Sequence, residues 1–246
     1  EKFEENDPAI LGGMFAVWND HAGNGITVKD IHDRLFPALQ TLSAKCWTGA
    51  ATSFSFEDFN RLRLALSEAP AVNEAARWQK GKLLRIETLN PGQTTGEKEV
   101  GYGYRVEFTI EGADEPKGTV LFSSDNATFY LSDPESGQLG FAHEGYLNKF
   151  NYRVEKGKKV TLAITGDNRK TCLYVDGKLR EELGPITLYA MQQKDLATFQ
   201  KSDVAATQPI VYNPSAKMYY QRTLVFPLQK AGDFKSRITG VKVEQK

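Results

Sequence analysis

Residues 102–110 alternate strictly between apolar and polar side chains, and this pattern limits the possible folds more than any other. Val106 and Phe108 fall on one face of the pattern, while Arg105 and Glu107 fall on the other. A period of two residues is typical of a β-strand that buries one face. We therefore expect this strand to belong to a sheet that covers a hydrophobic core.

Similar short strands follow along the chain, separated by turn residues such as Asp-Pro-Glu-Ser-Gly at 133–137 and Asp176-Gly177. Asp-Gly between two apolar runs is a strong signal for a tight β-hairpin. Many short strands joined by such turns predict an antiparallel β-sandwich over residues 78–246. The predicted strands are 119–123, 127–131, 139–143, 150–154, 160–164, 171–175 and 238–243.

Residues 160–164, followed after a turn by residues 173–179, resemble a hairpin of laminin-G-like domains, which belong to the concanavalin A-like superfamily. The resemblance covers most of residues 80–246 and implies a sandwich fold. It fails over residues 184–222, which we interpret as an insertion or a long loop. Sandwiches of this kind serve as lectins, glycanases and adaptors, so the fold alone does not define the function. The closely spaced acids of its glycanases, Glu-x-Asp-x-Glu or Glu-x-Asp-x-x-Glu, are absent from the sequence.

The start of the chain has a different pattern, because residues 10–18 form an apolar run without a polar side chain. Such a run predicts a strand buried on both faces, as in parallel sheets covered by helices. The carboxyl ends of such strands carry the chemistry in (β/α)-barrels, so Trp18 and Asp20 are candidates for a binding pocket. The alternative is that Trp18 belongs to a core and that Asp20 caps the following helix.

Two helices are predicted after this run. Thr27 and Asp30 have the spacing of a capping box, which predicts the start of the first helix. Pro37 lies inside the helical pattern and is expected to kink or break it. The second helix is expected to start at Ser55 and to end before Pro70. The predicted apolar face of the first helix consists of Ile31, Leu35, Ala38, Leu39 and Leu42.

Residues 12–20 and 28–40 together resemble the last strand and helix of family 20 glycoside hydrolases. That family contains the β-N-acetylhexosaminidases and lacto-N-biosidases. The resemblance rests on the Trp-x-acid ending of the run and on His32-x-x-x-Phe-Pro-Ala in the helix. It implies that residues 1–77 are the C-terminal end of a (β/α)8 catalytic barrel. It also implies that Trp18 walls the N-acetylhexosamine pocket and that Asp20 binds hydroxyl groups of the sugar.

The same resemblance implies substrate-assisted retaining hydrolysis of terminal N-acetylhexosamine or lacto-N-biose units, by an Asp-Glu pair on an earlier strand. We expect that pair in an upstream barrel of the same polypeptide, so this chain alone is predicted to be inactive. Glu57-Asp58 and Asp114-Glu115 are interpreted as structural acids instead. The resemblance further implies an extracytoplasmic protein. The alternative function is a non-catalytic module that binds carbohydrate or braces the barrel.

Composition excludes several other functions. The net charge is 0, with 25% charged residues, so there is no basic excess for nucleic acid. No apolar stretch is long enough for a membrane span. The two cysteines, Cys46 and Cys172, are expected to be buried free thiols. With no spacing of metal ligands, neither a metal nor a cofactor is predicted.

Two weaker possibilities concern the predicted sandwich. Some relatives of laminin-G-like domains bind calcium, for which Asp125, Asn126 and Asp133 are available, although turns favour these residues in any case. Sugar binding would need exposed aromatic rings beside amides, and Tyr146 near Asn148 is a candidate. The competing interpretation places Tyr146 at the edge of the core.

Overall fold

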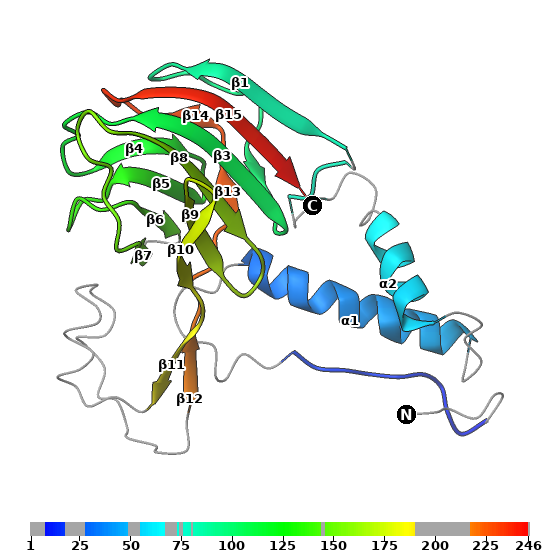
Figure 1. The fold of residues 1–246 in the computed structure, drawn as a ribbon. Helices are drawn as coiled ribbons and strands as arrows, with labels where there is room; N and C mark the ends of the chain where they lie inside the picture. The colour runs from blue at the N-terminus through cyan, green and yellow to red at the C-terminus, as the bar shows by residue number, and fades with distance from the viewer. Residues whose placement is uncertain are drawn as a thin grey trace.

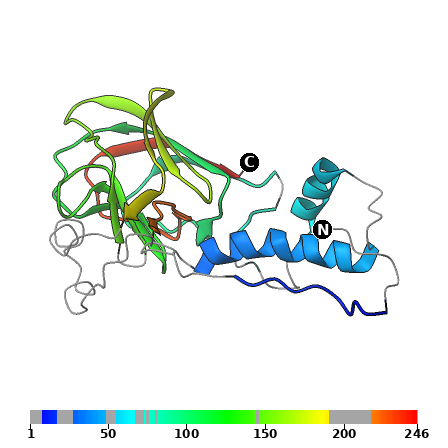
Figure 2. The same ribbon diagram turned by 90° about the horizontal axis from the view of Figure 1, so that it is seen from below.

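The computed structural model describes residues 8–17, 28–48, 55–66, 73, 76–79, 81–143, 146–189 and 217–245. These residues form an antiparallel β-sandwich and, beside it, an extended segment with two helices (Figure 1). Helix α1 begins against one end of the sandwich and extends away from it, as two perpendicular views show (Figures 1 and 2). The prediction of a mainly β, antiparallel sandwich is confirmed.

Two sheets make up the sandwich, one with six strands in the order β1-β15-β3-β8-β9-β10 and one with five in the order β14-β4-β5-β6-β7. Two short pairs, β11-β12 and β13-β2, complete the described strands. Every pairing is antiparallel. The strands are β1 (Leu83–Leu89), β2 (Glu99–Val100), β3 (Tyr104–Glu111), β4 (Thr119–Ser123), β5 (Ala127–Ser132), β6 (Gly140–His143), β7 (Tyr146–Lys149), β8 (Lys159–Gly166), β9 (Thr171–Val175), β10 (Lys178–Leu183), β11 (Ile186–Tyr189), β12 (Lys217–Tyr220), β13 (Phe226–Pro227), β14 (Lys230–Ala231) and β15 (Arg237–Gln245).

Strand β3 confirms the alternation read from the sequence, because its side chains are alternately buried and partly exposed until the last residue. The predicted hairpin is also present, since Lys178 pairs with Val175 across the turn. Asp176 and Gly177 both have positive φ, 48° and 78°, as a type I′ turn requires.

The strand predicted over residues 150–154 is wrong, because the chain has no strand there and pairs β7 with β6 instead. The alternation has another cause. Phe150 is fully buried, and Tyr152 and Val154 pack against the core while partly exposed. An irregular edge segment therefore mimics the period of a strand.

Phe226 packs at the centre of the sandwich and joins its two sheets. Its ring centroid lies 5.7 Å from that of Tyr104 on β3, 6.2 Å from Phe122 on β4 and 5.1 Å from Phe129 on β5. All four rings are essentially inaccessible to solvent. Aromatic side chains bury large apolar areas, so this cluster supplies much of the hydrophobic stabilisation of the sandwich.

The two predicted helices are α1 (Val28–Thr48) and α2 (Phe56–Ala65). Ser55 is the N-cap of α2, as predicted, and its hydroxyl accepts a hydrogen bond from the Asp58 amide. Pro37 does not break the first helix, because α1 continues through it, so that half of the expectation is wrong and the kink stays a prediction. A proline removes only one backbone hydrogen bond, a cost that the remaining bonds of a 21-residue helix offset.

Ile10–Val17 is extended but belongs to no strand, and only Phe15 in it is partly buried. The prediction of a strand buried on both faces is therefore wrong for this chain. A buried strand needs neighbours on both edges, and the described residues provide none for this segment. Its Leu11 and Met14 are 102% and 94% exposed.

The barrel remnant and the division into residues 1–77 and 78–246 stay predictions. For residues 184–222, interpreted as an insertion or a long loop, the insertion stays a prediction and the loop is wrong at the two ends. There, β11 and β12 pair with each other, while residues 190–216 lie outside the described part of the chain.

Candidate functional site

The extended segment runs along α1, and a glycine allows the close approach. A Cβ atom built on Gly13 would lie only 2.7 Å from Cδ1 of Leu42 and 3.7 Å from Sγ of Cys46. The segment and the helix point in opposite directions (Figure 1). Consecutive, antiparallel packing of an extended segment and a helix is the arrangement of a βα unit.

The two predicted site residues, Trp18 and Asp20, lie outside the described residues, as does Thr27 of the predicted capping box. They fall in the connection between Val17 and Val28, which links the extended segment to α1. Their assignment to a sugar pocket therefore stays a prediction.

Asp30 lies close to the start of α1, next to the connection between Val17 and Val28. Its contacts were not expected from the sequence. Its carboxylate is completely buried in the first turn of α1. Oδ1 accepts hydrogen bonds from the hydroxyl groups of Tyr102 and Thr223, the latter at 2.9 Å. Both donors belong to the sandwich, so this carboxylate joins the helix to it.

The protonation of Tyr102 suits this contact. Burial, and next the negative charge of Asp30, raise the pKa of Tyr102 well above its ordinary value. The hydroxyl therefore stays protonated and donates to the carboxylate throughout the neutral pH range. Hydrogen bonds to charged groups are stronger than those between neutral groups, so the pair is suited to fixing the first turn of α1.

A second contact beside Asp30 is ionic. Nζ of Lys29 lies 2.6 Å from Oε1 of Glu99, and both side chains are largely buried. The carbonyl oxygen of Glu99 also accepts a hydrogen bond from Nε1 of Trp78 at 3.0 Å. Lys29 at the start of α1 and Trp78, which precedes the first strand of the sandwich, therefore both contact the short strand β2.

His143, at the end of β6, is a histidine whose pKa responds to the charge of Asp30. Its side chain is 4% exposed. Burial lowers the pKa of His143, and the negative charge of Asp30 opposes that effect only in part. The imidazole is therefore neutral at pH 7, and within the described structure its Nε2 has no hydrogen-bond partner.

The acid pairs noted in the sequence have structural surroundings. Glu115 Oε1 accepts hydrogen bonds from the amides of Lys235 and Ser236, at 2.9 and 2.7 Å, and from the Ser236 hydroxyl at 2.7 Å. Asp58 lies in the first turn of α2 and pairs with Arg61 at 2.8 Å. These contacts support the interpretation of both pairs as structural acids.

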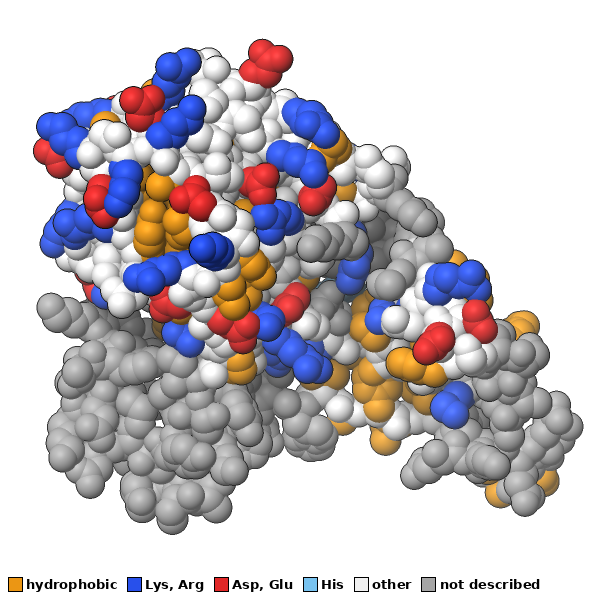
Figure 3. Space-filling model, in the orientation of Figure 1, with side chains coloured by type: hydrophobic (Ala, Val, Ile, Leu, Met, Phe, Trp, Pro, Cys, Tyr) orange, Lys and Arg blue, Asp and Glu red, His pale blue; other side chains and the backbone are white. Residues whose placement is uncertain are grey.

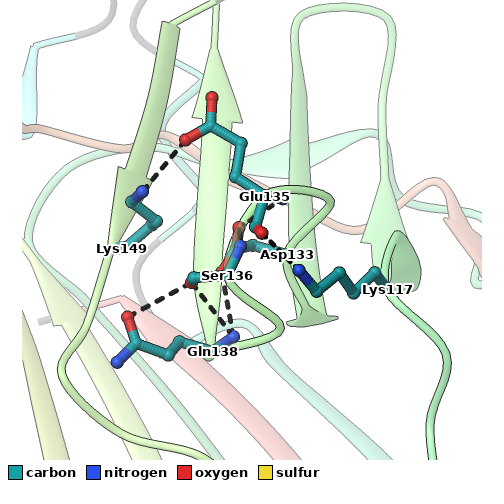
Figure 4. A network of polar contacts seen from close by, with 6 residues as sticks. All are labelled: Lys117, Asp133, Glu135, Ser136, Gln138 and Lys149. Carbon is teal, nitrogen blue, oxygen red and sulfur yellow. Dashed lines mark hydrogen bonds and ion pairs between the residues drawn. The ribbon is translucent and has the colours of Figure 1, made fainter. Parts of the chain in front are cut away.

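Asp133 belongs to a turn in which each oxygen of its carboxylate accepts two hydrogen bonds (Figure 4). Oδ1 accepts from the amides of Glu135 and Ser136, both at 2.8 Å, while Oδ2 accepts from the Gln138 amide at 2.9 Å and from the Ser136 hydroxyl. Burial alone would raise the pKa of Asp133, but these hydrogen bonds lower it overall.

The other calcium candidates, Asp125 and Asn126, belong to a different turn, between β4 and β5. Asp125 lies 3.9 Å from Lys98 Nζ on the surface. In the parts of the chain that the structure describes, no three His, Cys, Asp or Glu side chains form a group able to hold a metal.

The sugar-binding candidate on the sandwich also differs from expectation. Asn148 is buried, with 4% of its surface exposed, and Tyr146 is partly buried. An open sugar platform needs an exposed ring and an accessible amide, and this pair offers only part of that. The result favours the interpretation of Tyr146 as an edge residue.

Exposed hydrophobic side chains gather over α1 and α2, where Figure 3 shows them among charged residues. Trp47 at the end of α1 is 91% exposed and Phe56 at the start of α2 is 76% exposed. Cys46 is exposed as well, so its predicted burial is wrong, whereas Cys172 is a buried free thiol as predicted. Among the described residues no helix combines the length and apolar character that crossing a membrane requires.

No known family matches the sequence, and no curated protein matches it. Several solved structures resemble part of the fold. The chain is similar to domain 4 of an extracellular arabinanase of Geobacillus stearothermophilus in complex with arabinotriose, at 11% identity, a TM-score of 0.31 and coverage of 65% of each chain. It is also similar to a galectin of Caenorhabditis elegans, at 8% identity and a TM-score of 0.37, covering 65% of this chain and 96% of the galectin.

A third likeness is to the sialidase of Trypanosoma rangeli, at 16% identity and a TM-score of 0.28. It covers 58% of this chain and 20% of the sialidase. The chain therefore spans less than two thirds of the arabinanase domain and one fifth of the sialidase. Likenesses with TM-scores this low carry no argument about function, which has to come from the side chains.

Sequence reasoning placed Asp30 in a capping box with Thr27, which stays a prediction because Thr27 lies outside the described residues, and it missed the contacts of Asp30 to the sandwich. Its contacts to Tyr102 and Thr223 span 72 and 193 residues of sequence. A local spacing rule reports only contacts within one helical turn. The one available signal was that Asp30 lies between apolar positions at the start of an amphipathic helix.

Proposed function

We propose that this chain is the C-terminal part of a glycoside hydrolase similar to family 20, which removes terminal N-acetylhexosamine or lacto-N-biose units from glycans. The extended segment and α1 supply the last βα unit of a (β/α)8 barrel in residues 1–77. Residues 78–246 supply an appended sandwich. The natural location of such a protein is outside the cytoplasm, where its glycan substrates occur.

The observation that carries the proposal is the exposed apolar segment packed along α1. Leu11 and Met14 are almost completely exposed, although the segment has the composition of a strand buried on both faces. Contiguous exposed apolar surface marks an interaction site in soluble proteins. Strands of a preceding barrel, pairing with both edges of Ile10–Val17, would bury these side chains.

Trp18 and Asp20 have distinct roles in this proposal. Trp18 forms an apolar wall that holds the sugar ring where its acetamido group attacks the anomeric carbon. Asp20 accepts hydrogen bonds from hydroxyl groups of the same sugar. The general acid Glu, and the Asp that orients the acetamido group, belong to the upstream barrel, so the described acids of this chain perform no catalysis.

A second candidate function is a non-catalytic module that binds carbohydrate or braces the barrel. Bracing is favoured by the buried junction of α1 with the sandwich at Asp30. The two functions are compatible, because a sandwich that braces a hydrolase does not need a sugar site of its own.

The test compares the chain with the complete gene product that contains it. With a chromogenic N-acetylglucosaminide as substrate, the chain alone is expected to release nothing above the blank, and the complete gene product to turn the substrate over. Turnover by the purified chain, or none by the complete gene product, would contradict the proposal.

Replacing Asp20 separates a sugar contact from a structural role. Loss of a hydrogen bond to a charged group costs about 1.5–3 kcal/mol, so Asp20→Ala in the complete gene product should lower kcat/KM by about 10- to 150-fold. Trp18→Ala should lower kcat in particular, because the acetamido group is then misplaced. A lower melting temperature with an unchanged kcat/KM would show that Asp20 does not contact the sugar.

A further inference from the structure

Strand β1 forms one edge of the six-stranded sheet, since the described residues place no strand beyond it (Figure 1). With seven residues, Leu83–Leu89, it is the longest of the four strands at which the two sheets end. It contains neither proline nor lysine, residues that commonly prevent an edge strand from pairing with another chain. An edge of this length and composition is suited to receive a further strand.

The charged side chains of β1 differ from those of its neighbour in the sheet. On β15, Lys242 and Glu244 form an ion pair with each other at 2.6 Å. Arg85 and Glu87 have the same spacing on β1 and are both exposed. Within the described part of the chain, neither of them forms an ion pair or a side-chain hydrogen bond. The edge therefore presents one positive and one negative charge to a partner.

The geometry of antiparallel pairing limits how two copies of β1 can meet. Residues directly opposite each other point to the same face of a sheet, whereas neighbours along one strand point to opposite faces. A two-fold axis that relates two copies therefore passes beside a residue and not between two residues. Ile86 is the middle residue of β1, so an axis at Ile86 pairs the strand over its whole length.

The register about Ile86 is also the one that matches the charges. It places Arg85 of each copy opposite Glu87 of the other, which gives two pairs of opposite charges. An axis at Arg85 or at Glu87 would place two like charges opposite each other, and that arrangement destabilises a strand pair. Leu83 is 40% exposed and Leu84 is partly exposed, so both can lose further contact with water in the pair.

The other edge of the same sheet, β10, lacks this match. Pairing Arg180 of one copy with Glu182 of another requires an axis at Glu181, which then lies opposite its own copy. Glu182 is moreover already paired with Lys170, at 2.7 Å. The charges of β10 therefore oppose a symmetric strand pair, whereas those of β1 favour one.

We propose that β1 is an interaction surface for a second copy of this protein, with the two strands pairing antiparallel about Ile86. The six-stranded sheets of the two copies then form one continuous sheet. This role is independent of the proposed hydrolase function, because β1 belongs to the sandwich. A single pair of strands buries a small area, so we expect a weak dimer that forms as the concentration rises.

Charge reversal tests the register in this chain, by sedimentation velocity over a series of concentrations. The unsubstituted protein should shift from the mass of one chain toward twice that mass. Arg85→Glu places like charges opposite each other at both pairs, and so does Glu87→Arg. Each variant should weaken dimerisation at least about tenfold. Its melting temperature should stay unchanged, because both side chains are exposed.

Mixing the two single variants gives the sharpest measurement. In an equimolar mixture, the two negative charges of Arg85→Glu face the two positive charges of Glu87→Arg, so dimers should form again. The double variant Arg85→Glu/Glu87→Arg should dimerise as well, with the charges in reverse order. Arg180→Glu is the matched control, because it makes the same charge change on β10 at the other edge. It should dimerise like the unsubstituted protein.

A protein that keeps the mass of one chain at every concentration would overturn the proposal. A dimer that both single variants leave unchanged would overturn it too, since association then uses another surface, such as the exposed residues 10–17. Equal weakening by Arg180→Glu would assign the interface to the wrong edge. Weakening in each single variant, with recovery in their mixture, supports the proposal.

Discussion

The sandwich and the N-terminal part of this chain contain similar apolar residues and treat them in opposite ways. Phe226, Phe122 and Phe129 of the sandwich are completely buried between two sheets. In the N-terminal part, Leu11, Met14 and Trp47 are almost completely exposed. The difference teaches that an apolar sequence pattern specifies burial only where the chain also supplies the opposing surface.

Substitutions in the core should show the largest difference in stability between the sandwich and the N-terminal part. Phe226→Ala should destabilise the chain by about 3–5 kcal/mol, because it leaves a cavity among three aromatic rings. Leu11→Ala should change the free energy of unfolding by less than about 0.5 kcal/mol, since the side chain is already in water. Urea denaturation followed by circular dichroism measures both values, and equal effects would show that the two regions do not differ.

The buried turn at Asp133 gives a smaller effect that depends on pH. Asp133→Ala removes the acceptor of the part-buried amides of Glu135, Ser136 and Gln138 and should cost about 1–3 kcal/mol. Because folding lowers the pKa of Asp133, its contribution is complete above the ordinary carboxyl pKa and disappears as the pH falls through the lowered value. Wild type should therefore lose more stability between pH 5 and pH 2 than Asp133→Asn, and parallel losses would contradict this.

The reaction rates of the two thiols test the same difference between the two regions and need no substitution. Cys46 on α1 is exposed, whereas Cys172 on β9 is buried. Burial, and next the charge of Glu182, raise the pKa of Cys172 and so lower its thiolate fraction. Native Cys46 should react with an alkylating reagent at least about tenfold faster than Cys172. Mass spectrometry of the labelled peptides measures the two rates, and similar rates would contradict the difference in burial.

In the sandwich, sequence reasoning succeeded where the residues of one strand or turn are enough to predict its structure. The alternation of β3 and the Asp176-Gly177 turn needed no knowledge of distant residues. It failed at 150–154, because Phe150 and its neighbours alternate while covering a core edge, whereas the backbone of the segment forms no strand and only Phe150 and Tyr152 bond to Leu139. Periodicity reports which side chains face a core, and not how the backbone is paired.

Reasoning from the sequence was weaker for the candidate site. The Trp-x-acid ending indicated Trp18 and Asp20 as sugar-binding residues. That role needs the neighbouring strands of a barrel, which the described residues do not supply. The role of Asp30 was out of reach, because its partners Tyr102 and Thr223 are distant in sequence. Local spacing predicted a helix cap, which stays a prediction, and it gave no sign of the contacts to Tyr102 and Thr223.

The central claim is that, in the complete protein, residues 10–17 are buried by another part of the same polypeptide. The most direct test is Met14→Lys, made both in this chain and in the complete gene product. The matched control is Leu179→Lys on β10, where the side chain is 54% exposed.

In the chain alone, both variants should keep the melting temperature of the unsubstituted protein. In the complete gene product, Met14→Lys should lower it strongly, because an unpaired charge is then buried, and Leu179→Lys should again have no effect. A complete gene product that tolerates Met14→Lys as well as Leu179→Lys would contradict the account.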